Sequence, residues 1–367
     1  MRKVLAVTGT RADYGIYKPV FDALHASDKI DLGLIVTGMH LSEAFGHTID
    51  AIITDGFSIV AELDTLSSED TPEGTRVFAE ATQKGCLEIF EKEKPDIVFV
   101  LGDRTEMLAA AKAASALSIP IAHLHGGESS GSLDDAQRHA ITQLASIHLT
   151  SAQPHADAIK QMKPDENPEN IFVVGAPALD VITSIELVPK DILFAMARFI
   201  DTQKTIIFVQ HPDTLEELSI ADQIQPSLDA LNSFDGNILI IGANADAGGR
   251  EMNAALQEFA KQKSQCTFFI SISHQEYFSW LSVADVLVGN SSSGIIEAAS
   301  FNLPVVNIGD RQKGRLRSGN VRDVPYGSID IGNAITQSLD SDGAYQNLYG
   351  DSSASERITA ILEEISL

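Results

Sequence analysis

The sequence predicts an α/β protein with two doubly wound parallel sheets, one in each half of the chain. At 367 residues the chain is too long for a single ordinary hydrophobic core, which predicts two domains. Short apolar runs rich in β-branched residues alternate with segments of helical composition, as in parallel strands covered by helices. This alternation occurs twice. Residues 177–204, between the two series, contain no clear strand and are the expected hinge.

The expected strands end in glycine or in a polar turn. In the first half they are KVLAVTG, LGLIVTG, DIVFVLGD, IPIAHLHGG and IFVVG, with helices expected over residues 77–93 and 106–117. In the second half they are KTIIFVQHP, GNILIIGAN, CTFFISIS, ADVLVGNSSSG and LPVVNIG. Ligands of doubly wound sheets bind beyond the carboxyl ends of the strands, so functional residues are expected in the loops that follow these runs.

Composition narrows the range of partners. The formal net charge of −25 argues against a nucleic acid or an anionic membrane as partner. No apolar run is long enough to cross a bilayer, and the first apolar run is too short for an export signal. The two cysteines, Cys86 and Cys266, form no disulfide framework or zinc motif, which fits a reducing cytoplasm.

A serine- and glycine-rich loop, GNSSSG at residues 289–294, follows an expected strand, and a helix is expected to begin near Gly294. Backbone N–H groups at a helix N-terminus, with serine hydroxyls beside them, suit a phosphate. Glu297, about one turn into that helix, suits a vicinal diol such as ribose. The alternative is an ordinary serine N-cap with a glutamate in the first turn. The loop is not a P-loop, because it lacks the G-x-x-x-x-G-K-[ST] pattern.

A basic run, GDRQKGRLRSG at residues 309–319, follows the strand LPVVNI in an otherwise acidic chain. It contains Arg311, Lys313, Arg315 and Arg317, and arginine forks bind phosphate oxygens with defined geometry. The run therefore suits a polyphosphate. The alternative is a solvated loop that balances nearby acidic residues.

Two polar positions follow strands of the first half. Arg11 lies just past the first strand, from where it would reach a phosphate, although the G-x-G-x-x-G fingerprint is absent. Asp103 and Arg104 end the run DIVFVLGDR, where they form either a structural ion pair or part of a catalytic site.

The segment HLHGGESSGSLDDAQRHA, residues 123–140, concentrates titratable groups. His123 and His125 alternate on an expected strand and so share a face, with His125 nearer its end. Ser132 and Asp135 form a capping box that starts a helix.

On that helix Asp135 and His139 are four residues apart, as are Asp134 and Arg138. His211 follows the first strand of the second half. Such Asp–His clusters suit general acid and base catalysis. A metal site is the last choice, because no H-E-x-x-H or comparable ligand spacing occurs.

Together these motifs resemble the hydrolysing UDP-N-acetylglucosamine 2-epimerases of sialic-acid-type biosynthesis. The resemblance rests on VTGTRADYG, VTGMHLSEAFGHT, LGDRTE, HLHGGESSGSLDDAQRHAIT, HPDTLE, NADAGGREM, GNSSSGIIEA and NIGDRQKGR. It runs nearly end to end and implies the GT-B architecture, with two Rossmann-like domains and the active site between them. The implied domains are residues 1–182 and 183–350, with a helix at 351–367 packing back on the first.

The resemblance also implies roles for residues at the matching positions. His125 stands where the non-hydrolysing enzymes carry glutamate. The catalytic candidates are Asp103, Asp134, Asp135, His139, His211, Glu128 and His125. The substrate-binding candidates are Arg11, Arg104, Asn244, Asp246, Ser291, Ser292, Ser293, Gly294, Glu297, Arg311 and Lys313.

The implied reaction is elimination followed by hydration, without a metal or other cofactor. A base removes the proton on carbon 2 as UDP leaves carbon 1, and water then adds to the 2-acetamidoglucal to give N-acetylmannosamine. The implied partners are the UDP-sugar and UDP, and the implied assembly is a homodimer or homotetramer.

Three alternatives stay open at this point. A sister enzyme of legionaminic acid biosynthesis acts on UDP-N,N′-diacetylbacillosamine, and NADAGGR is somewhat more similar to that branch. A GT-B glycosyltransferase would bind the same donor, and a regulatory protein would bind it without turnover.

Overall fold

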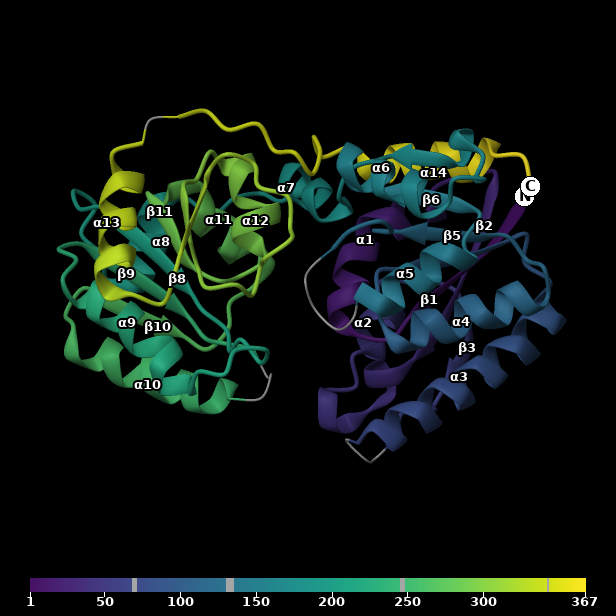
Figure 1. The fold of residues 1–367 in the computed structure, drawn as a ribbon, viewed down its shortest axis with the longest axis horizontal. Helices are drawn as coiled ribbons and strands as arrows, with labels where there is room; N and C mark the ends of the chain where they lie inside the picture. Colours follow the sequence, from purple (N-terminus) through teal and green to yellow (C-terminus); the bar gives the residue numbers. More distant parts are fainter. Residues whose placement is uncertain (68–70, 130–134, 245–247, 342) are drawn as a thin grey trace. The chain divides into compact units, whose positions relative to one another are not determined.

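The chain divides into two compact units (Figure 1). The computed structural model describes residues 1–67, 71–129, 135–244, 248–341 and 343–367. Unit 1 comprises Met1–Thr183 and Tyr349–Leu367, and unit 2 comprises Ser184–Leu348. In the part of the chain described, no helix combines the length and apolar character needed to cross a membrane.

Unit 1 is built on a sheet of seven parallel strands in the order β3-β2-β1-β4-β5-β6-β7. The strands are β1 (Arg2–Thr8), β2 (Ile30–Thr37), β3 (Ile59–Leu63), β4 (Ile97–Leu101), β5 (Ile121–Leu124), β6 (Ile147–Thr150) and β7 (Ile171–Val173). The strand order reverses between β1 and β4, which is the topological switch point where doubly wound sheets bind ligands. The loops after these two strands therefore lie at the binding edge.

Helices flank this sheet, and each begins after a strand. They are α1 (Arg11–His25), α2 (Ile49–Thr54), α3 (Pro72–Glu93), α4 (Thr105–Ala116), α5 (Asp135–Leu144), α6 (Gln153–Met162), α7 (Asp180–Ser184) and the C-terminal α14 (Ala354–Glu364). Thr10 and Asp13 form a capping box that starts α1. Helix α14 packs against α1, and the two chain termini lie side by side in unit 1 (Figure 1). The Arg2 guanidinium accordingly donates to the Leu362 carbonyl over 2.6 Å.

Unit 2 repeats the same plan with six parallel strands in the order β10-β9-β8-β11-β12-β13. The strands are β8 (Thr205–Val209), β9 (Asn237–Ile241), β10 (Cys266–Phe269), β11 (Val286–Gly289), β12 (Val305–Ile308) and β13 (Val321–Val324). The helices are α8 (Lys190–Ala197), α9 (Ile220–Asn232), α10 (Gly249–Gln262), α11 (His274–Val283), α12 (Ser293–Ile296) and α13 (Ser328–Leu339). Here the order reverses between β8 and β11, which again marks the ligand-binding edge.

The predicted fold class is confirmed, but three strands escaped the sequence analysis. The edge strands β3 and β13 are only partly buried and carry charged residues, so neither forms a continuous apolar run. Strand β6 is fully buried, but it is only four residues long, and its sequence IHLT contains the polar residues histidine and threonine. Apolar periodicity alone does not detect strands of this kind.

Buried neutral histidines make the stability of this fold sensitive to acid. Burial lowers the pKa of His40 to about 4, of His123 to about 3 and of His148 to about 4. Between pH 6.5 and pH 4 the unfolded chain therefore binds protons that the folded chain does not. Stability is fully present above the unfolded value of 6.5 and is lost as the pH falls through this window.

We expect the free energy of unfolding to fall by on the order of 1–2 kcal/mol per buried ring between pH 7 and pH 5. Urea unfolding of the wild type and of His40→Gln at both pH values measures the effect. The variant should lose less stability than the wild type over this interval. An equal loss in the two proteins would show that His40 contributes nothing to the acid sensitivity.

Candidate functional site

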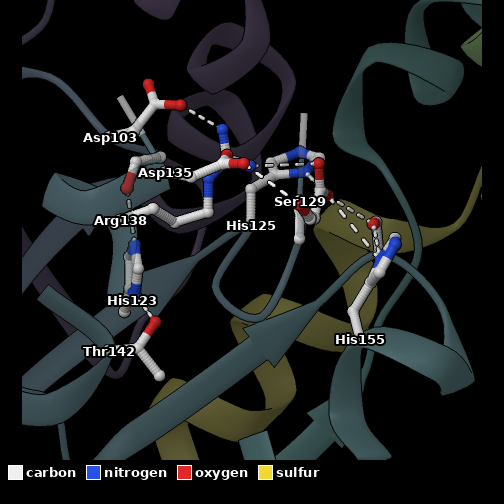
Figure 2. A network of polar contacts seen from close by, with 11 residues as sticks. Asp103, His123, His125, Ser129, Asp135, Arg138, Thr142 and His155 are labelled. Carbon is white, nitrogen blue, oxygen red and sulfur yellow. Dashed lines mark hydrogen bonds and ion pairs between the residues drawn. The ribbon is translucent and has the colours of Figure 1, made fainter. Parts of the chain in front are cut away.

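The predicted residues of unit 1 lie mostly in loops after three adjacent strands. Asp103 follows β4, His125 and Glu128 follow β5, and Ser151, which was not predicted, follows β6. Because β4, β5 and β6 are neighbours in the sheet, their carboxyl ends bring these loops together. Helix α5 adds Arg138, and Figure 2 shows the polar network that results.

Glu128 is the centre of this network. Its carboxylate accepts hydrogen bonds from His125 Nδ1 over 2.5 Å, from Ser151 Oγ over 2.6 Å and from Arg138 Nη1 over 3.3 Å. Burial alone would raise the pKa of Glu128, but His125, His155 and Arg138 outweigh it and hold that pKa well below its usual range. Glu128 is therefore a buried carboxylate anion.

Arg138 joins Glu128 to Asp103 through a second ion pair, and its side chain is only 6% exposed. Figure 2 shows the contact between Arg138 and Asp103. An ion pair between Asp103 and its neighbour Arg104 was one of the two alternatives left open by the sequence, and the structure pairs Asp103 with Arg138. The Arg104 Nε instead donates to Glu106 in the first turn of α4, over 2.6 Å. Asp103 thus takes a partner from helix α5, whereas Arg104 takes one two residues further along the chain.

His123 and His125 were predicted to share a face of one strand. Strand β5 ends at Leu124, so His125 lies outside it and the two do not share a strand face. His123 is fully buried, with Nε2 2.8 Å from the Gly102 carbonyl and Nδ1 3.2 Å from the Thr142 hydroxyl. Both of its ring nitrogens are used, so His123 is structural. His125 lies past the strand with a φ of 62°, a left-handed conformation that few non-glycine residues adopt, although asparagine, aspartate and histidine adopt it more often than the rest.

Helix α5 places the remaining candidates of this segment. Asp135 accepts a hydrogen bond from Ser129 Oγ over 3.0 Å (Figure 2). His139, four residues further along α5, is half-buried. Asp134 lies outside the described residues, as does Ser132 of the predicted capping box.

The sequence analysis missed two acidic residues that interact near the end of β1, Asp13 and Glu106. Asp13 accepts from the Thr8 hydroxyl and from the Thr10 backbone N–H over 2.9 Å. Burial, followed by the charge of Glu106, raises the pKa of Asp13 to about 7. The capping signature T-x-x-D in TRAD was the available signal. Arg11, the first residue of α1, is exposed.

Glycine is required between these groups. A Cβ at Gly9 would lie 2.2 Å from Glu106 Oε1, so no larger residue fits there without moving the carboxylate. Gly9 of VTGTRADYG therefore allows the loop to pack closely against Glu106. Its role does not require a dinucleotide-binding fingerprint.

In unit 2 the buried Asn290 holds the loop after β8 to the loop after β11. Its side chain accepts from the His211 N–H over 2.7 Å and donates to the His211 carbonyl over 2.9 Å. The Asn244 N–H donates to His211 Nδ1 over 3.1 Å, so in the neutral ring the hydrogen resides on Nε2. His211 therefore presents a donor at Nε2. Asp246 lies outside the described residues.

The serine loop differs from the ordinary N-cap that was the alternative interpretation. Helix α12 begins at Ser293, beside the predicted start at Gly294, and Ser292 at its N-cap makes no side-chain capping hydrogen bond. Ser293 Oγ accepts from the Tyr277 hydroxyl over 2.7 Å, a contact that the sequence analysis missed. The Ser293 N–H donates to Ser291 Oγ over 3.4 Å and the Gly294 N–H donates to the Ser291 carbonyl over 3.1 Å, so these two backbone groups already have partners.

Glu297 was predicted to lie about one turn into the helix. Helix α12 ends at Ile296, so Glu297 directly follows it. Its Oε2 is buried and has no hydrogen-bond partner in the described part of the chain. Burial raises the pKa of Glu297 above its usual value. A buried acceptor without a partner is costly, and a ligand hydroxyl would satisfy it.

The basic run divides into two kinds of residue. Lys313 pairs with Asp310 over 2.6 Å, and Arg317 pairs with Asp323 over 3.0 Å, as the solvated-loop alternative expects. Arg311 instead reaches the Asn290 carbonyl, with Nη1 at 3.3 Å, and so lies beside the loop after β11. Among the described residues no group of histidine, cysteine or carboxylate side chains could hold a metal ion.

Comparison with known proteins identifies the family. The family model for UDP-N-acetylglucosamine 2-epimerase matches residues 22–363. A UDP-N,N′-diacetylbacillosamine 2-epimerase (hydrolyzing) of Legionella pneumophila is 40% identical over 370 residues, which cover 100% of this chain and 97% of the relative. The polysialic acid biosynthesis protein P7 of Escherichia coli is 35% identical over 347 residues, which cover 93% of this chain and 87% of the relative.

A solved structure has the same fold. The UDP-GlcNAc 2-epimerase from Neisseria meningitidis, bound to UDP-GlcNAc, aligns with a TM-score of 0.82 and 19% identity over 98% of this chain and 99% of its own. The predicted GT-B fold and the predicted family are therefore confirmed. This chain is an enzyme, and it belongs to the UDP-N-acetylglucosamine 2-epimerase family.

Proposed function

We propose that the protein is a hydrolysing 2-epimerase that converts UDP-N,N′-diacetylbacillosamine and water to UDP and the free 2-epimeric sugar. The observation that carries this proposal is the 40% identity, over the whole chain, to the Legionella enzyme with that printed activity. UDP-N-acetylglucosamine is the second candidate, because the Neisseria structure with the same fold holds that nucleotide sugar. The product would feed nonulosonate biosynthesis, of the legionaminic acid or sialic acid type respectively.

The reaction begins with elimination. A base removes the proton on carbon 2, the carbon 1–carbon 2 double bond forms, and the bond to UDP breaks with its electrons leaving on the diphosphate. Water then adds at carbon 1 and a proton at carbon 2, from the face opposite to the one deprotonated. The proton on carbon 2 is weakly acidic, so stabilising the leaving group must contribute much of the rate.

In this proposal the loops of unit 2 stabilise the leaving diphosphate and the nucleoside. His211 donates from Nε2, the serine loop supplies hydroxyl donors, and Glu297 accepts from the ribose. Asn244, Asp246, Arg311, Lys313 and Gly294 complete this group. Arg11 and Arg104, in unit 1, are the other substrate-binding candidates. The proton-handling residues come from Asp103, His125, Glu128, Asp134, Asp135 and His139.

Turnover in deuterated water tests the proposal directly. The enzyme is incubated with each of the two UDP-sugars, with and without a chelator, and NMR follows free UDP and the sugar. The expected products are UDP and a free 2-epimer deuterated at carbon 2, formed faster from UDP-N,N′-diacetylbacillosamine and unaffected by the chelator. A nucleotide-linked epimer, or transfer to an added acceptor without epimerisation, would contradict hydrolysis.

Arg311→Ala is expected to weaken UDP binding by roughly 10- to 100-fold, because a guanidinium hydrogen bond to phosphate contributes about 1.5–3 kcal/mol. Titration calorimetry with UDP measures this change. Arg322→Ala, on the exposed side of β13, is the matched control and should bind UDP like the wild type. An unchanged UDP affinity in Arg311→Ala would remove Arg311 from the nucleotide site.

A further inference from the structure

We propose that His125 is the base that removes the carbon-2 proton, through Nε2, and that Glu128, Ser151 and His155 position it. The proposal deepens the function proposed above and rests on it. The argument uses the backbone at His125, the tautomer of its ring and the hydrogen-bond chain behind Glu128.

The backbone of His125 is held in an unfavourable conformation. With a φ of 62° directly after β5, it adopts a left-handed geometry, although a non-glycine residue there costs free energy. The His125 N–H donates to the Leu149 carbonyl over 3.0 Å, which ties the residue to the neighbouring strand β6. The backbone fixes the position of His125 at the ligand-binding edge of the sheet, and the Nδ1 contact to Glu128 holds the ring.

The tautomer follows from the partner of Nδ1. Glu128 is ionised and can only accept, so the hydrogen of a neutral His125 ring resides on Nδ1, 2.5 Å from Glu128 Oε1. The lone pair is then on Nε2. That atom is buried and has no hydrogen-bond partner in the described part of the chain. The His125 side chain as a whole is 11% exposed, and Nε2 is the ring nitrogen left to accept a proton.

Glu128 is itself immobilised by groups from other elements. Ser151 donates its hydroxyl hydrogen to Glu128, so Ser151 Oγ must accept from His155 Nδ1, 2.9 Å away on α6. Arg138 holds the other carboxylate oxygen. These contacts make a directed chain from His155 through Ser151 and Glu128 to His125. Figure 2 labels its two ends, His155 and His125.

The chain accounts for proton acceptance. When Nε2 takes the proton from carbon 2, the electron pair of that C–H bond becomes the carbon 1–carbon 2 double bond and the UDP oxygen takes the electrons of the breaking bond. The imidazolium then faces the Glu128 anion, which neutralises it, as the carboxylate does in catalytic triads. His123 cannot replace it, because both of its ring nitrogens are already hydrogen-bonded.

The test uses His125→Asn, since asparagine tolerates left-handed backbone but transfers no proton. We expect kcat for UDP release to fall by about 10²- to 10⁴-fold with little change in KM. Hydration of the 2-acetamidoglucal supplied together with UDP should stay near the wild-type rate. His25→Asn, at the exposed end of α1, is the matched control. Wild-type UDP release by His125→Asn, or equal loss of glycal hydration, would overturn the assignment.

Two further measurements keep the proposal testable if His125→Asn does not fold. In wild-type enzyme labelled with ¹⁵N-histidine, the ring nitrogen shifts should show hydrogen on Nδ1 and none on Nε2 of His125; the reverse tautomer would overturn the proposal. Glu128→Gln should lower kcat, with KM unchanged, by up to about 10⁴-fold. Inactivity of the wild type towards both UDP-sugars would refute the proposed function instead.

Discussion

Arg138→Met is expected to lower the free energy of unfolding by about 3–5 kcal/mol and to abolish turnover. Arg138 bridges Asp103 and Glu128, and the guanidinium is 6% exposed. Methionine fills much of the space but leaves both carboxylates without their cation in a poorly solvated site. Urea unfolding and an assay for released UDP measure the two effects.

Arg76→Met is the matched control for Arg138→Met. Arg76 also bridges two carboxylates, Glu73 and Glu80, but its side chain is 54% exposed. Exposed ion pairs contribute about 0–1 kcal/mol, so Arg76→Met should change stability little and leave turnover intact. Arg138→Lys keeps the charge without the fork that reaches both partners, and an intermediate loss is expected. Equal stability losses in Arg76→Met and Arg138→Met would contradict the role assigned to burial.

Asp135→Asn is expected to reduce formation of the free 2-epimer by about 10²- to 10⁴-fold while UDP binding stays intact. We propose that the Asp135 carboxylate acts in hydration, where it takes a proton from the water that adds at carbon 1. Asparagine has nearly the same shape and can still accept the hydrogen bond from Ser129, which in the wild type spans 3.0 Å. The loss would then come from the missing base.

The expected signature of Asp135→Asn is accumulation of the 2-acetamidoglucal, seen by NMR after a burst of UDP. Asp157→Asn, at an exposed position on α6, should behave like the wild type. Loss of UDP affinity in Asp135→Asn would place Asp135 in nucleotide binding instead. Together with His125→Asn, this variant separates the two half-reactions.

Much of the fold was predictable because alternating apolar runs and helical segments are local properties of the chain. The central strands β1, β4, β8 and β11 are nearly or fully buried, so their sequences are continuous apolar runs. The edge strands β3 and β13 were missed because each keeps polar residues on an exposed side. The edge strands β7 and β10, IFV and CTFF, were predicted because they consist mostly of apolar residues, so composition decides which edge strands are detected.

The candidate site was predictable as a set of residues but not as a set of contacts. The segment 123–140 identified Glu128 and His125, yet Glu128 receives hydrogen bonds from Ser151, 23 positions away, as well as from Arg138. Asp103 and Arg104 are neighbours, but each pairs elsewhere. Sequence spacing detects partners three or four residues apart on a helix, whereas these partners meet because β4, β5 and β6 are adjacent strands.

By itself the sequence determined the α/β class, the family and the chemical types present at the strand ends, because motifs and periodicity are written in consecutive residues. Only the tertiary structure decided that His123 is structural while His125 Nε2 has no hydrogen-bond partner among the described residues, although the two stand two positions apart. The physical reason is that a ring's hydrogen-bond partners select its tautomer, and those partners come from other strands and helices. The same amino acid therefore supports the sheet at one position and presents a base at the other.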